Sequence, residues 1–173
     1  AFSCGSATRS GQEQQHETAK TGEQVINVDY VTLRHKTGNS EPDKYYDGNR
    51  GKLGAGSCTV TFSNIPVLEE IADSFPIYLP DERIELTSVQ ETGMETLVND
   101  IARYADHKNT NIVLYIHGYN IDFEKSCRRS AIFQRAIGLH DCLILFSWPA
   151  DGNMLKYTWD ESDLVWSIAH ITT

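Results

Sequence analysis

Residues 112–152 read IVLYIHGYNIDFEKSCRRSAIFQRAIGLHDCLILFSWPADG, and their pattern is the strongest indication of the fold class. Two short, wholly apolar runs, Ile112–Ile116 and Cys142–Phe146, frame it. Each run is typical of a strand that is buried on both faces of a parallel sheet. Between them, Asp122 can cap a helix that runs to about Ile137. Strand, helix and strand in this order predict a parallel crossover unit.

The segments before this unit have the patterns of further strands and a helix. Alternating, β-branched stretches predict strands over residues 25–34, 58–62 and 84–89. Residues 37–56 contain five glycines among polar residues and are expected to form a long loop. Apolar residues at helical spacing predict a helix over 94–105, opened by a capping box from Thr92 to Glu95.

A last helix is expected near the end of the chain, with four residues on its apolar side: Leu164, Val165, Ile168 and Ala169. Taken together, the order of elements predicts the α/β class, with a mostly parallel sheet and flanking helices. The last helix should lead into a further parallel strand. The sheet is therefore expected to be incomplete at the carboxyl end of these 173 residues.

Composition narrows the class of protein. The chain has 40% hydrophobic and 23% charged residues, an ordinary globular mixture. Fifteen Lys+Arg against 24 Asp+Glu give a net charge of −9, which argues against a nucleic-acid partner. No apolar run approaches the roughly 20 residues of a membrane-spanning helix. The cysteines and histidines lack metal-ligand spacing and the glycines form no phosphate loop, so neither a metal nor a cofactor is expected.

Two loops follow the apolar strands, at the edge where open α/β sheets place their ligands. The first is His117-Gly118-Tyr119-Asn120, and the second begins with Ser147-Trp148-Pro149. An HGYN turn and an FSWP strand end at this separation resemble the α/β-hydrolase superfamily, and most closely a poorly characterised bacterial branch of it. The resemblance spans residues 25–173 and implies that they are the N-terminal part of such a domain.

The resemblance implies a role for the HGYN turn in an oxyanion hole. The backbone N–H of Tyr119 would be the donor, and the side chain of His117 would brace the turn rather than act as a base. Gly118 is expected to allow close approach and unusual φ values, and Asn120 to lock the loop through local hydrogen bonds. The alternative is a tight strand-to-helix turn without a catalytic role. Three further residues are expected either to wall a substrate pocket or to pack under the neighbouring loop: Ser147, Trp148 and Pro149.

No G-x-S-x-G elbow, which carries the superfamily's nucleophile, occurs in the chain. Four side chains were weighed as substitutes and none has an evident catalytic partner: Ser126, Cys127, Ser130 and Ser147. His170 has no nucleophile in evident reach. The expected function is therefore the N-terminal portion of a serine hydrolase of esterase or lipase type. The nucleophile, acid and histidine would come from the remainder of the same domain, beyond Thr173, and this chain alone is predicted to be inactive on small acyl or ester substrates.

The alternative function is a catalytically inactive hydrolase-fold binding module of the cell envelope. Residues 1–24 are a polar leader, expected to be disordered. Within it, Ser3-Cys4-Gly5 resembles the end of a bacterial lipoprotein signal peptide. A lipid on Cys4 would tether the protein to a membrane in the envelope or periplasm; without one, the protein would be cytoplasmic. The other cysteines are expected to be buried free thiols, or to include one bridged pair in an exported protein: Cys58, Cys127 and Cys142.

Overall fold

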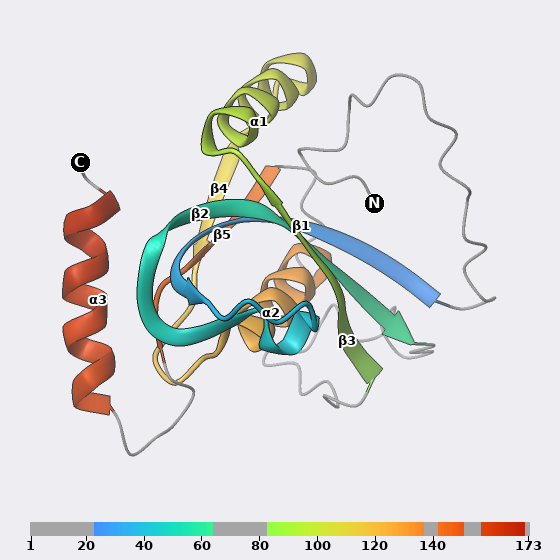
Figure 1. Cartoon of the computed structure of the whole chain (residues 1–173). Helices are drawn as coiled ribbons and strands as arrows, with labels where there is room; N and C mark the ends of the chain where they lie inside the picture. Colours follow the sequence, from blue (N-terminus) through green and yellow to red (C-terminus); the bar gives the residue numbers. More distant parts are fainter. Residues whose placement is uncertain (1–22, 64–82, 137–141, 151–156, 172–173) are drawn as a thin grey trace.

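In the computed structural model, which describes residues 23–63, 83–136, 142–150 and 157–171, five strands form one sheet in the order β3-β2-β1-β5-β4 (Figure 1). The strands are β1 (Glu23–Lys36), β2 (Tyr46–Ser63), β3 (Ile84–Thr92), β4 (Ile112–Ile116) and β5 (Cys142–Ser147). β1, β5 and β4 pair in parallel, whereas β2 is antiparallel to both β1 and β3. Only β2 therefore runs against the other strands, which confirms the predicted α/β class with a mostly parallel sheet.

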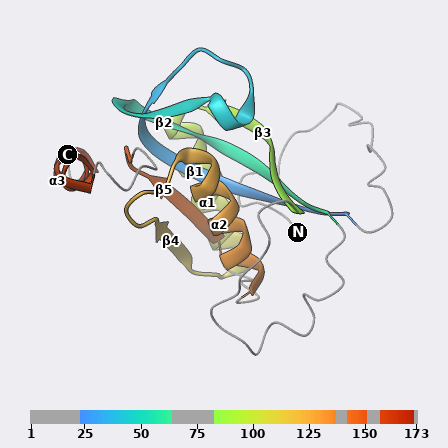
Figure 2. The ribbon, with the colours of Figure 1, turned by 90° about the horizontal axis from the view of Figure 1, so that it is seen from below.

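Helices lie on both faces of this sheet. They are α1 (Met94–Lys108), α2 (Phe123–Ala136) and α3 (Tyr157–Ile171), and a short 3-10 helix, η1 (Pro42–Lys44), precedes β2. α2 lies over one face of the sheet, against β1 and β5 (Figure 2). Its residues Phe123, Cys127 and Ala131 belong to the largest core cluster of the described residues. α1 packs on the opposite face against Cys142 and Ile144. The predicted crossover β4–α2–β5 is thus present.

The glycine-rich stretch expected to be a loop is mostly strand, because β2 begins at Tyr46. Two of its glycines allow neighbouring backbones to approach closely. A Cβ on Gly51 would lie 2.3 Å from the carbonyl oxygen of Arg34, and one on Gly56 would lie 2.1 Å from that of Gln90. The glycines that suggested a loop are therefore needed inside the sheet, where β2 bends against β1 and β3 with shifts in register.

The predicted helix over 94–105 is confirmed as α1, but its predicted capping box is wrong. The N-cap residue is Gly93, and no side chain caps the first turn. The predicted cap of α2 is present, because the backbone N–H of Lys125 donates to Asp122 Oδ1 at 2.8 Å.

The prediction that residues 112–116 are buried on both faces is wrong, because β4 is the last strand of the described sheet. Ile112, Leu114 and Ile116 are 50%, 53% and 52% exposed. Their register partners on β5 are Cys142, Ile144 and Phe146, so they face the side of the sheet that carries α1. An apolar face of β4 is thus uncovered in the described part of the chain.

α3 lies at the periphery, at the left of Figure 2, and packs differently from the prediction. Leu164 and Trp166 contact a cluster that contains Phe146 and Trp148. Val165 and Ile168, expected on the packed side, are 64% and 54% exposed. The apolar stripe on α3 therefore meets the sheet along only part of its width.

The three described cysteines differ in state. Cys58 and Cys127 are buried free thiols, whereas Cys142 is disulfide-bonded. Cys4 and the rest of residues 1–22 lie outside the described residues. Among the helices of the described part, none has the length and apolar character needed to cross a membrane.

Candidate functional site

The two loops singled out in the sequence meet at one edge of the sheet. β4 and β5 are parallel neighbours that end level with each other, with Ile116 opposite Phe146. The rings of His117 and Trp148 stack at 5.1 Å with an interplanar angle of 11°. Trp148 Nε1 donates to the carbonyl oxygen of His117 at 2.9 Å. The ring of Tyr119 stands edge-on to Trp148 at 5.5 Å, so the HGYN turn rests on the indole.

Arg34, which sequence analysis did not select, lies at the centre of this arrangement. It is on β1, is 1% exposed, and uses all three guanidinium nitrogens as donors. Nε donates to Ser147 Oγ at 2.9 Å. Nη1 donates to the carbonyl oxygen of Ala150 at 2.8 Å and to that of Asp47 at 3.4 Å. Nη2 donates to the Ile121 carbonyl oxygen at 2.6 Å and lies 3.3 Å from His117 Nε2. The strand pattern contained a signal for this burial, since Arg34 follows buried Tyr30 and Thr32 at a period of two.

The hydrogen bonds of His117 define its tautomer. Nδ1 lies 2.8 Å from the carbonyl oxygen of Gly118, which can only accept, so Nδ1 carries the proton. Nε2 is then free to accept from Arg34 at 3.3 Å. Burial and the charge of Arg34 lower the pKa of His117 from 6.5 to about 3. The imidazole is therefore neutral at pH 7 and braces the turn.

The bond from His117 to Gly118 also orients the next N–H group. The carbonyl of Gly118 and the N–H of Tyr119 belong to one planar peptide unit and point in opposite directions when that unit is trans. Because the Gly118 carbonyl is held by His117 Nδ1, the Tyr119 N–H is directed away from the imidazole. A backbone donor with a fixed direction is the component that an oxyanion hole requires.

The left-handed residue of the turn is Asn120, with φ of 58°, and not Gly118. The expectation of an unusual φ at Gly118 is therefore wrong. Asn120 can take the left-handed position because asparagine adopts this conformation more readily than most residues. Apart from its two chain neighbours, no atom of the described residues lies within 4 Å of a Cβ placed on Gly118. The glycine instead leaves open space beside the peptide unit that carries the Tyr119 N–H.

Ser147 is fully buried and lies within the network. Its Oγ accepts from Arg34 Nε and lies 3.1 Å from Ser126 Oγ and 3.4 Å from His117 Nε2. Since the Ser126 hydroxyl donates to the carbonyl oxygen of Phe123 at 2.7 Å, Ser126 Oγ can accept a hydrogen bond from the Ser147 hydroxyl. With Trp148 and Pro149 also buried, these residues pack beneath the turn and present no surface to a ligand.

The other side chains weighed as catalytic groups are held in local contacts. Ser130 Oγ donates to the Ser126 carbonyl oxygen at 2.9 Å, and burial raises the pKa of the Cys127 thiol. His170 is exposed on α3, where its Nδ1 lies 2.8 Å from the Trp166 carbonyl oxygen. In the described ranges, no group of three or more His, Cys, Asp or Glu residues could hold a metal ion.

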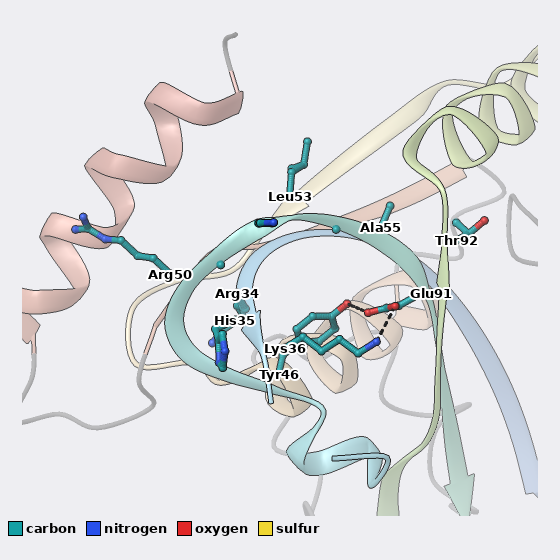
Figure 3. Close-up of a pocket in the computed structure, with 12 residues that line it drawn as sticks. Arg34, His35, Lys36, Tyr46, Arg50, Leu53, Ala55, Glu91 and Thr92 are labelled. Atoms are coloured by element: carbon teal, nitrogen blue, oxygen red, sulfur yellow. Dashed lines mark hydrogen bonds and ion pairs between the residues drawn. The ribbon is translucent and has the colours of Figure 1, made fainter. Parts of the chain in front are cut away.

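A cavity of about 680 Å³ lies under the bend of β2 (Figure 3). Within it, Lys36 Nζ lies 2.9 Å from Glu91 Oε2, and the Tyr46 hydroxyl donates to Glu91 Oε1 at 3.1 Å. Arg50 points away from the cavity towards α3, where its Nε donates to Asp163 Oδ1 at 2.6 Å. No residue of the HGYN turn lines this cavity.

The depressed pKa of His117 predicts acid sensitivity. Between pH 6.5 and about 3 the unfolded state binds a proton that the folded imidazole does not, so the free energy of unfolding falls as the pH falls. The slope is about 1.4 kcal/mol per pH unit, or about 2 kcal/mol between pH 6.5 and 5. Urea unfolding at several pH values should show this slope in the wild type and in His35→Gln, but not in His117→Gln. Equal slopes in all three proteins would contradict the assignment.

Residues 91–173 match the model of a family described as "Alpha/beta hydrolase of unknown function (DUF900)". Over this region the chain is similar to the α/β-hydrolase superfamily, which confirms the resemblance for these residues. No curated protein and no solved structure matches the chain. The matched residues include the HGYN turn, α2, β5 and α3, whereas β1, with Arg34, and β2 precede them.

Proposed function

We propose that the chain is the N-terminal portion of a serine α/β hydrolase that cleaves ester or acyl bonds, and that the Tyr119 N–H is one donor of its oxyanion hole. The observation that carries this proposal is the 2.8 Å bond between His117 Nδ1 and the Gly118 carbonyl oxygen. That bond fixes the peptide plane whose other end is the Tyr119 N–H.

The surroundings of this peptide unit suit acyl transfer. Catalysis of this kind needs a donor that is already oriented when negative charge develops on the carbonyl oxygen. Trp148 holds the start of the turn from below, and Tyr119 remains 36% exposed. The open space beside Gly118 gives a substrate carbonyl room to approach.

The nucleophile is proposed to come from sequence beyond Thr173, together with its acid and histidine. Among the described residues, Ser147 Oγ lies 3.4 Å from His117 Nε2, but Ser147 is fully buried and His117 is too weak a base to activate it. The exposed apolar side chains of β4 support this division. A further strand beside β4 would pair its open edge, and a further helix would cover Ile112, Leu114 and Ile116.

The second candidate is a hydrolase-fold binding module without catalysis. It is favoured by the buried network itself, in which Arg34, Ser147 and His117 satisfy one another's hydrogen bonds. A lipid on Cys4, if present, would place such a module in the cell envelope. The two candidates differ in whether a reactive serine follows the described fold.

Labelling with a fluorophosphonate probe separates these candidates. We expect the product of the complete reading frame to be labelled at a serine beyond Thr173. Residues 1–173 alone should remain unlabelled and should hydrolyse p-nitrophenyl butyrate no faster than buffer, with or without Ser147→Ala. Labelling of Ser126 or Ser147, or an ester hydrolysis that Ser147→Ala abolishes, would refute the proposal. A complete product that takes no label would instead support the binding module.

A further inference from the structure

We infer that Arg34 is a positioning residue for the oxyanion turn, through which β1 sets the direction of the Tyr119 N–H. The catalytic meaning of this role rests on the proposed function, whereas the positioning itself is independent of any reaction. Arg34 lies 83 positions from His117 in the chain and outside the residues that match the family.

One nitrogen of Arg34 holds both ends of the turn. Nη2 donates to the Ile121 carbonyl oxygen at 2.6 Å and lies 3.3 Å from His117 Nε2. The residues between these contacts are Gly118, Tyr119 and Asn120. The distance between the two ends of the turn is therefore set by a single planar group.

The rest of the guanidinium holds the loop after β5. Nε and Nη1 donate to Ser147 Oγ and to the Ala150 carbonyl oxygen, at 2.9 and 2.8 Å. Thr32 adds a second tie from β1, because its Oγ1 donates to the Ser147 carbonyl oxygen at 2.7 Å. The two loops are thus fixed relative to each other by neighbouring residues of one strand.

Arg34 also selects the tautomer of His117. An N–H of Arg34 that faces Nε2 requires that nitrogen to be unprotonated, which leaves the proton on Nδ1. The Nδ1–H then holds the Gly118 carbonyl, whose peptide plane carries the Tyr119 N–H. Lysine cannot replace arginine here, because one ammonium cannot reach acceptors that are spread around a planar fork.

Nitrogen-15 NMR of the imidazole groups tests this inference in residues 1–173 without any substitution. We expect His117 to carry its proton on Nδ1 at pH 7, with Nε2 as an acceptor. A proton on Nε2 would overturn the inference, because two N–H groups would then face each other. This measurement decides the question even if variants at Arg34 do not fold.

Arg34→Lys tests the same inference by nitrogen-15 NMR. We expect the Nδ1–H tautomer of His117 to lose its dominance and the backbone amide resonance of Tyr119 to shift, because the peptide plane is no longer held by the imidazole. The matched control is Arg50→Lys, because Arg50 pairs with Arg34 across β1 and β2 but binds Asp163 on α3. An Arg34→Lys protein that matches the wild type in both readouts would overturn the inference.

These readouts test the positioning role of Arg34 separately from the proposed hydrolase activity. If His117 has the expected tautomer and Arg34→Lys has the expected effect, the positioning role of Arg34 is supported even when no serine of the complete product takes a fluorophosphonate label. If a serine is labelled but Arg34→Lys leaves the His117 tautomer and the Tyr119 resonance unchanged, the proposed hydrolase is supported and the positioning role of Arg34 is refuted.

Discussion

Replacing Trp148 with alanine should lower the free energy of unfolding by about 3–5 kcal/mol, the cost of removing a large aromatic side chain from a packed interior. Trp148 is 1% exposed and packs in a cluster with Leu33 and Phe146. Its ring stacks on His117, and its Nε1 donates to the His117 carbonyl oxygen at 2.9 Å. The substitution therefore removes packing and a buried hydrogen bond together, and urea unfolding at pH 7 measures the loss.

One further variant separates the contribution of the hydrogen bond from that of packing, and a second serves as a control. Trp148→Phe keeps an aromatic ring but leaves the His117 carbonyl without its donor, so we expect a smaller loss of about 1–3 kcal/mol. Trp166→Ala is the matched control, because Trp166 is only partly buried on α3, and it should cost less than Trp148→Ala. A loss below about 1 kcal/mol for Trp148→Ala would show that the indole does not support the turn.

Local periodicity was enough to predict most of the strands and helices. The alternation in residues 25–34 and the helical spacing from Met94 depend only on near neighbours in the chain, and both elements are present. The strand over 46–56 could not be found in this way. Its glycines are explained by the backbones of Arg34 and Gln90, which approach from distant segments.

The exposed face of β4 has a similar explanation. An apolar run such as IVLYI predicts a buried strand, but the pattern does not show which elements cover each face of that strand. The side chains of Val113 and Tyr115 are partly buried, and Tyr115 packs against Phe133 of α2. The alternate residues, Leu114 among them, face the uncovered side.

The meeting of the two site loops follows from topology, since the carboxyl ends of adjacent parallel strands lie together. Arg34 could not be identified by the same reasoning. Its contacts with His117, Ser147 and Ala150 span 83, 113 and 116 positions in the chain. A period of two places Arg34 on a buried face, but only the folded sheet shows which acceptors it meets there.

Removing the Tyr119 N–H while leaving its side chain in place tests whether this group is an oxyanion-hole donor. In the complete, probe-reactive gene product, a tyrosine α-hydroxy acid at position 119 replaces that N–H with an ester oxygen. We expect kcat for an ester substrate to fall by about 10²–10³, the effect of losing one oxyanion-hole donor. Tyr119→Phe, which keeps the N–H, should remain within about threefold of the wild type. A folded ester variant with an unchanged kcat would contradict the proposal that this turn stabilises the oxyanion.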